Sequence, residues 1–144
     1  KGERFTGKPV RLRSTHAKLY AADPVLMQGI TKIVTSLEGE ERGRIAETLA
    51  HNVIRLFPGV SDISYYREPS GQQEIDFVAR VGSRAVPIEI VYKNQTDNRH
   101  RDSICAFLET HGKQNSFGSL VTKESWKIEQ PIIEMPLSIF LLTA

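Results

Sequence analysis

The sequence predicts a single α/β domain in which a mixed central sheet is flanked by helices. Two alternating stretches, residues 74–80 and 87–93, lie on either side of a turn at Gly82 and Ser83, as expected of a β-hairpin. A helical pattern precedes this hairpin, and a second helical pattern leads from it to a buried strand. The chain of 144 residues suits one compact domain with a proper core and leaves little room for a second.

The composition is that of an ordinary soluble globular protein, with 40% hydrophobic and 25% charged residues. The net charge of +2 is too small to indicate a nucleic-acid binder by itself. A single cysteine, Cys105, forms no internal disulfide and fits a reducing cytosol, so we expect a cytoplasmic protein. No apolar run approaches the roughly 20 residues that cross a bilayer.

Residues 1–17 are predicted to be a basic linker or arm ahead of a domain at residues 18–144. Basic side chains outnumber acids in this first segment, and glycines and a proline interrupt any periodicity. A solvated terminus and an arm that follows a nucleic-acid backbone both fit the pattern. The domain is expected to begin with a short strand at residues 18–22, after which Asp23-Pro24 opens a helix that ends near residue 34.

A longer amphipathic helix is predicted at residues 42–57. Glu47 lies on the border of its apolar stripe, because it shares a helix face with Ala50 and Ile54. An acid at that position either reaches solvent or points at a site on the sheet. The stripe itself comprises Ile45, Leu49, Val53 and Leu56, with Ala46, Ala50 and Phe57 beside them.

The predicted hairpin places two acids where they can meet. On one face of its strands we expect Asp76 and Glu89 to lie side by side, since neighbouring strands are about 4.8 Å apart. Two carboxylates at that separation are close enough to share a divalent cation. Pro87 removes a ladder donor, so pairing is expected to pass through a bulge or to begin near Ile88. The opposite face of the first strand would carry Ile75, Phe77, Ala79 and Val81.

The remaining elements are predicted from apolar runs and capping residues. A strand at residues 63–67 precedes the hairpin. A helix is expected at residues 99–110, with Gly112 at its C-terminal end. Buried strands are expected at residues 117–122 and 137–142. The inner face of the helix would comprise Ile104, Phe107 and Leu108.

From residue 42 onward the predicted order is helix, three strands, helix and strand (αβββαβ), with Glu47 on the first helix, Asp76 on the second strand and Glu89 on the third. This arrangement resembles the restriction-endonuclease-like superfamily, whose motif is written PD-(D/E)XK. It is more closely similar to the C-terminal domain that follows the P-loop module in a large group of prokaryotic AAA-type ATPases. The likeness covers nearly the whole chain from Lys18 and is carried by residues 43–47, 65–67, 74–78, 87–90, 118–123 and 136–142.

The resemblance implies a site for phosphodiester hydrolysis. Such a reaction needs a divalent metal that polarises the phosphoryl oxygen and activates a bound water. Mg²⁺ is the cofactor that Glu47, Asp76 and Glu89 would bind. The resemblance also implies an AAA-type ATPase domain N-terminal to this chain in the same polypeptide, with DNA or a second copy of the chain as further partners. No GxxxxGK[ST] motif occurs in the chain, so the ATPase activity would reside elsewhere.

The main departure from the superfamily is Val91, which stands where the resemblance implies a water-activating lysine two residues after the second acid. Lys93 lies on the same strand face, about 6.6 Å further along. Either Lys93 replaces the lysine and completes a catalytic set with Asp76 and Glu89, or the scaffold has lost the chemistry. Lys93, Arg99 and Arg101 also form a basic segment that either contacts phosphates or is simply solvated.

Three functions remain open on these grounds. The first is an accessory domain of an AAA-type ATPase, degenerate in its catalytic lysine, that binds nucleic acid or a protein partner. The second is a working Mg²⁺-dependent DNA endonuclease. The third is a protein-interaction or oligomerisation module that never touches nucleic acid.

Overall fold

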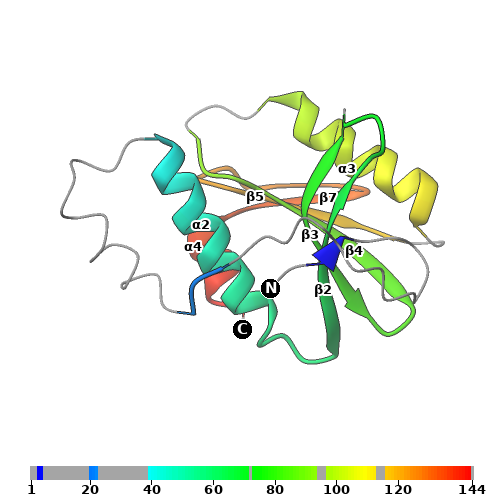
Figure 1. Ribbon diagram of the computed structural model, residues 1–144. Coiled ribbons are helices and arrows are strands. Elements are labelled where there is room, and N and C mark those ends of the chain that lie inside the picture. The colour runs from blue at the N-terminus through cyan, green and yellow to red at the C-terminus, as the bar shows by residue number, and fades with distance from the viewer. Residues whose placement is uncertain are drawn as a thin grey trace.

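A computed structural model of the chain (Figure 1) describes residues 3–4, 20–22, 39–71, 73–93, 97–112 and 116–143. The predicted helix at residues 24–34 and most of the predicted basic arm lie outside the described residues. No helix among the described residues is long and apolar enough to span a membrane. In chain order the elements are β1 (Glu3–Arg4), α2 (Gly39–Ile54), β2 (Val60–Arg67), β3 (Glu74–Val81), β4 (Arg84–Val91), α3 (Asn98–His111), β5 (Gly118–Thr122), β6 (Lys127–Glu129), β7 (Ile132–Pro136) and α4 (Leu137–Leu141).

The strands form one mixed sheet in the order β1-β2-β3-β4-β5-β7-β6. The pairs β1–β2, β4–β5 and β5–β7 are parallel, and the pairs β2–β3, β3–β4 and β6–β7 are antiparallel. The prediction of an α/β domain with a mixed central sheet is therefore confirmed, as is the order αβββαβ from α2 to β5.

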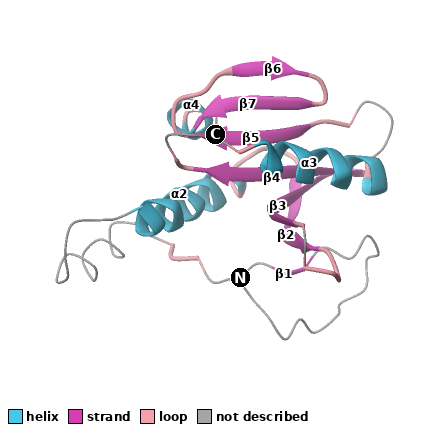
Figure 2. Ribbon diagram, turned by 90° about the horizontal axis from the view of Figure 1, so that it is seen from above, coloured by secondary structure: helices cyan, strands magenta, loops and turns pink. Residues whose placement is uncertain are grey.

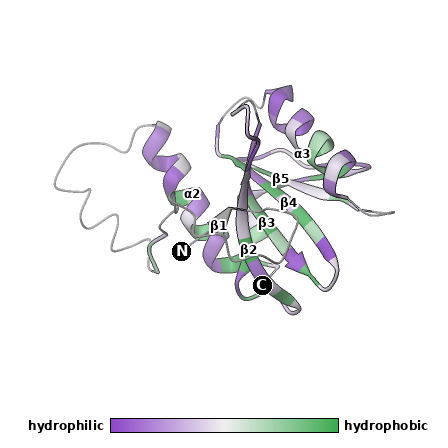
Figure 3. Ribbon diagram, turned by 45° about the vertical axis from the view of Figure 1, so that its right-hand side comes forward, coloured by the Kyte–Doolittle hydropathy of each residue, from purple (hydrophilic) through white to green (hydrophobic). Residues whose placement is uncertain are grey.

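Helices cover both faces of the sheet, and each face has its own apolar core (Figure 1). Figure 3 shows that the middle strands are mainly hydrophobic in colour, as strands covered on both faces should be. The first core joins α2 and α4 to one face of the sheet: Ala46, Ala50, Ile54, Phe77, Ala79, Ile88, Ile90, Val121, Leu137 and Phe140. The second joins α3 to the other face: Ile75, Val78, Val91, Ile104, Phe107, Leu120 and Ile132.

Helix α2 begins three residues before the predicted start, and Glu40 and Glu41 occupy its first turn, where the helix dipole favours acids. Its most buried apolar line is Ala46, Ala50 and Ile54, spaced four residues apart. The predicted stripe is therefore displaced. In particular, Leu56 follows the helix and is 70% exposed.

The β3–β4 hairpin forms as predicted around Gly82, whose φ of 58° is one that glycine adopts readily. Pairing starts at once, with Val81 opposite Arg84, and continues without a shift through Pro87 opposite Val78. The expectation that pairing would begin near Ile88 or pass through a bulge is wrong, because the proline lies within an even ladder.

A β-bulge in β3 reverses part of the predicted alternation. Ser64 of β2 lies opposite Val78, but Tyr66 lies opposite Ile75, so β3 carries one extra residue in this interval. As a result Ile75 packs on the α3 face, whereas Phe77 packs on the α2 face. The prediction that these two side chains share a face is therefore wrong.

Helix α3 confirms the predicted helix within one residue at each end. Asp97 is its N-cap, because its carboxylate Oδ1 accepts a hydrogen bond from the Arg99 N–H at 3.0 Å. At the other end the Gly112 N–H donates to the Leu108 carbonyl at 2.8 Å. Strand β5 likewise confirms the strand predicted at residues 117–122.

Two predicted strands need correction. The apolar run at residues 137–142 begins with the short helix α4, in which Leu137 and Phe140 are buried, while Ile139 between them is 40% exposed. Spacing of three residues between buried positions is helical, and so short an apolar run does not distinguish the two structures by pattern alone. Residues 20–22, part of the strand predicted at residues 18–22, are not in a strand.

The close approach of α3 to β5 requires Gly118. A Cβ atom there would lie 2.3 Å from the Ile104 Cγ2 and 3.1 Å from the Pro87 Cγ. We expect Gly118→Ala to lower the free energy of unfolding by about 1–3 kcal/mol in urea titrations. Gly43→Ala is the control, because nothing lies within 4 Å of its Cβ position in α2, and it should raise stability by up to about 1 kcal/mol. Equal stability of the two variants would contradict this packing.

Candidate functional site

The candidate site lies where β3 and β4 separate. Their ladder ends at the pair Phe77 and Ile88. Beyond that pair β3 continues along β2, while β4 continues along β5. Figure 2 shows β4, β5, β7 and β6 side by side, with β3 and β2 turned away from them. Asp76 and Glu89 are the first residues past the fork, one on each strand.

Each acid takes the place of the missing ladder bonds by binding the backbone of the other strand. The Glu89 Oε2 accepts a hydrogen bond from the Asp76 N–H at 2.9 Å. The Asp76 Oδ2 accepts one from the Ile90 N–H at 3.0 Å. Unpaired backbone N–H groups in this partly buried place would be costly, so these two bonds stabilise the fork. The predicted proximity of the two acids therefore comes with a specific structural task.

Glu89 has a second partner, His100 of α3. The Glu89 Oε1 lies 3.0 Å from the His100 Nδ1. The proton of this hydrogen bond can belong to either residue. A neutral Glu89 donates it to Nδ1, and an ionised Glu89 accepts it from an Nδ1–H. The contact ties the start of α3 to β4, and it occupies the remaining carboxylate oxygen of Glu89.

The environment of Glu89 favours its neutral form. Only 6% of the residue is exposed, and this burial raises the pKa of its carboxyl from the ordinary 4.5 to about 7. The hydrogen bond from His100 lowers the pKa in part, the charge of Asp76 raises it further, and the Asp76 N–H lowers it. Near neutral pH Glu89 is therefore close to its titration midpoint.

A cavity of about 510 Å³ opens beside the fork. It collects the predicted site residues Glu47, Asp76, Glu89 and Lys93, so the helix acid lines the same cavity as the two sheet acids. Five acids line it against two basic residues, which makes it acidic even with Glu89 neutral. The remaining lining residues are Gly39, Glu40, Gly43, Arg44, Glu74, Ile90, Val91, Tyr92 and His100.

The predicted basic segment does not gather at this cavity. Lys93 is exposed at its rim, but the side chain of Arg99 is 86% exposed and is paired with Asp97. Arg101 is paired with two carboxylates at 2.9 Å each, those of Glu129 and Glu134. These contacts join α3 to β6 and β7, so the Arg101 guanidinium is engaged within the fold.

The donors at the fork do not fit a Mg²⁺ site as they are arranged. Both oxygens of Glu89 are hydrogen-bonded, and because its pKa is raised, a metal that bound its ionised form would displace a proton. Among the described residues, no three His, Cys, Asp or Glu side chains are grouped so as to hold a metal ion. Magnesium binding by Glu47, Asp76 and Glu89 stays a prediction.

Val91 fills the position at which the resemblance implies a lysine. It is 2% exposed and belongs to the core beneath α3. Its partners there include Ile104, Phe107 and Leu120. The side chain is thus a packing element between β4, α3 and β5.

Sequence reasoning missed the role of His100, because it looked only for histidines spaced as metal ligands. A usable signal was present. His100 precedes Ile104 by four residues and Phe107 by seven, which places it on the predicted inner face of the helix. That face packs on the side of β4 that carries Glu89.

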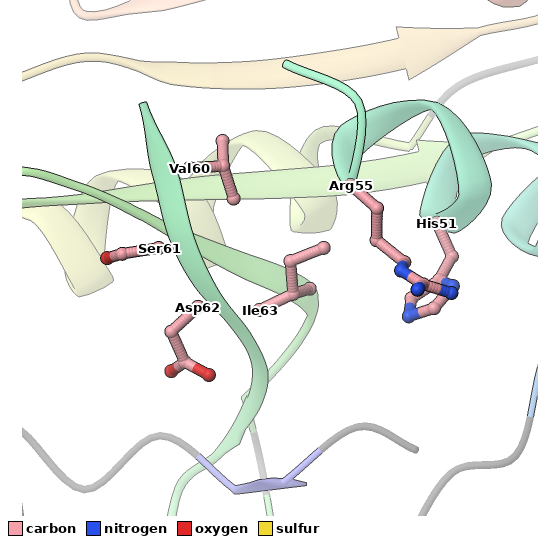
Figure 4. Close-up of a pocket in the computed structure, with 6 residues that line it drawn as sticks. All are labelled: His51, Arg55, Val60, Ser61, Asp62 and Ile63. Atoms are coloured by element: carbon pink, nitrogen blue, oxygen red, sulfur yellow. The ribbon is translucent and has the colours of Figure 1, made fainter. Parts of the chain in front are cut away.

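A second cavity, of about 440 Å³, lies between the end of α2 and the start of β2 (Figure 4). His51 and Arg55 line it from the end of α2, and Asp62 lines it from β2. The His51 ring stacks on Tyr20 with ring centres 4.4 Å apart, and burial lowers its pKa. His51 is therefore a packed, neutral residue near pH 7, and none of the predicted site residues lines this cavity.

Comparison with known proteins yields one match. A family model described as "Domain of unknown function (DUF4143)" matches residues 42–140, from the first turns of α2 to α4. No curated protein and no solved structure matches the chain significantly.

The raised pKa of Glu89 predicts a stability that depends on pH. The folded protein keeps this proton where the unfolded chain has lost it, so the stabilisation is complete below about pH 4.5 and is lost as the pH rises through about 7. Glu89→Gln keeps the shape and removes the titration. We expect it to gain on the order of 2 kcal/mol relative to wild type between pH 5 and pH 8, measured by urea unfolding.

The groups that face Glu89 from its neighbours are Asp76 and His100, and both remain in that variant. Glu109→Gln, an exposed glutamate of α3, is the matched control and should follow the wild-type profile. Parallel profiles for wild type and Glu89→Gln would contradict the burial of a titrating carboxyl at the fork.

Proposed function

The chain belongs to the DUF4143 family of domains of unknown function, and from that membership and the fork geometry we propose that it is a non-catalytic accessory domain of an AAA-type ATPase. Domains of this family are commonly found in proteins associated with AAA-type ATPases, which supports the proposed partner. In this proposal the domain keeps a restriction-endonuclease-like core, and its acids serve the fold.

The observation that carries the proposal is the packing of Val91. Val91 is 2% exposed and packs among the apolar side chains beneath α3, so it brings no ammonium group to the cavity that it lines together with Glu89. The proposal therefore takes the water-activating group to be missing two residues after Glu89. The hydrogen bonds of Asp76 and Glu89 to the opposite strands give both acids a reason to be present without catalysis.

The charge of the cavity favours a protein partner over nucleic acid at this site. Its lining carries more acids than basic groups, and Arg101 is held by two carboxylates. A phosphate backbone would meet net repulsion there, whereas a basic segment of a protein would be attracted. We therefore assign the accessory role to contacts with the ATPase or its partners.

One observation favours a second function, a metal-dependent nuclease. Lys93 lines the same cavity as Asp76 and Glu89, so the three residues of the alternative catalytic set do share a site. In that function Lys93 would have to take the role of the lysine that the resemblance implies at position 91.

Incubation with supercoiled plasmid and Mg²⁺ or Mn²⁺ separates the two functions. We expect wild type, Asp76→Ala and Lys93→Ala to give the same background nicking, because the proposal gives neither residue a catalytic role. If wild type cleaves the plasmid and both substitutions abolish cleavage, the non-catalytic role is wrong and the domain is a metal-dependent nuclease. Titration with duplex DNA on the same samples should show no steep loss of affinity with salt, since each phosphate contact contributes a slope of about 0.9.

A further inference from the structure

Within the described part of the chain, the sheet ends in a strand with an open edge. β6 has β7 as its neighbour on one side and is the last strand in the sheet order. Figure 2 shows it at the rim, with no other described element beyond it. The outer backbone N–H and C=O groups of such a strand are available to pair with another strand.

The edge is also unusually apolar on one face. Ile128 is 66% exposed, and Trp126, two residues earlier and so on the same side of an extended chain, is 58% exposed. Ile128 further lines a cavity of about 340 Å³ together with Phe117 and Gln130. Large apolar side chains gathered at an open strand edge are typical of an interaction surface.

The other face of β6 carries one charge of each sign. Lys127 and Glu129 flank Ile128 and form an ion pair with each other at 2.7 Å, and their side chains are 59% and 55% exposed. Glu129 also contacts Arg101, which identifies this as the α3 side of the sheet. If two copies of this strand were aligned antiparallel with Ile128 opposite Ile128, each Lys127 would lie opposite a Glu129.

We propose that β6 pairs antiparallel with β6 of a second copy of the chain, about a two-fold axis at Ile128. In this register Lys127 lies opposite Glu129 of the second copy, and Glu129 lies opposite its Lys127. A register centred on Lys127 would place lysine opposite lysine, and one centred on Glu129 would place glutamate opposite glutamate. The charges therefore select one register.

The same register gives the exposed apolar groups a partner. The two Ile128 side chains face each other, and Trp126 of each copy lies opposite Gln130 of the other. Since Gln130 lines the 340 Å³ cavity, the indole would cover the mouth of that cavity. Pairing would thus remove both Trp126 and Ile128 from water and join the two sheets into one.

Sedimentation velocity of the full 144-residue chain over a range of concentrations tests this interface. We expect a reversible dimer that Lys127→Glu and Glu129→Lys each weaken by on the order of 10-fold, because each variant faces like charges across the two-fold axis. The double variant Lys127→Glu/Glu129→Lys should regain the dimer. A mixture of the two single variants should form a heterodimer.

The control is Arg84→Glu, an exposed charge reversal at the start of β4, which should leave dimerisation unchanged. Thermal melts would confirm that every variant is folded; Arg101 retains Glu134 when Glu129 is changed. A monomer at every concentration would overturn the proposal and leave the edge to a strand of another protein. A dimer that the double charge exchange fails to restore would overturn it as well.

Discussion

The structure depends on two hydrogen bonds at the fork, from the Asp76 N–H to the Glu89 side chain and from the Ile90 N–H to the Asp76 side chain. Each carboxylate accepts the backbone N–H of the other strand, at 2.9 and 3.0 Å. These bonds let β3 leave β4 and follow β2, while β4 goes on to pair with β5 in parallel. Without them, two N–H groups at a crowded junction would lose their partners, at about 1–3 kcal/mol each. Where the backbone hydrogen bonds between β3 and β4 end, hydrogen bonds to the two acidic side chains take their place.

The direction of the neighbouring side chains follows from the fork and from the bulge beside it. The extra residue in β3 sends Ile75 toward α3 and Phe77 toward α2, so both cores are filled from one short segment. Past the fork, Glu89 meets His100 and Val91 enters the α3 core. Position 91, where the resemblance implies a lysine, therefore holds a packing residue in this chain. The same packing buries the Glu89 carboxyl and raises its pKa, so the raised pKa follows from the fold and does not require a catalytic role.

The sequence was sufficient to predict the elements that have a clear apolar periodicity or a residue typical of a helix end. Alternation predicted the hairpin and the proximity of Asp76 and Glu89, and Gly112 marked the C-terminal end of α3. The bulge at the fork was not predictable, because one inserted residue changes neither composition nor propensity. Helix α4 was missed because a run of five or six apolar residues fits either structure. The pairing of His100 with Glu89 depends on how α3 lies on β4, which is a matter of tertiary packing that alternation and caps do not report.

The most direct test of the account is the stability of Asp76 variants. Asparagine keeps an oxygen that can accept the Ile90 N–H, whereas alanine removes it. If the acid pair stabilises the fork, Asp76→Ala should lower the free energy of unfolding in urea at pH 7 by about 1–3 kcal/mol, and Asp76→Asn by less than half as much. An Asp76→Ala protein as stable as wild type, or more stable, would contradict the account. That result is expected if the two carboxylates repel each other and are kept for a metal rather than for the fold.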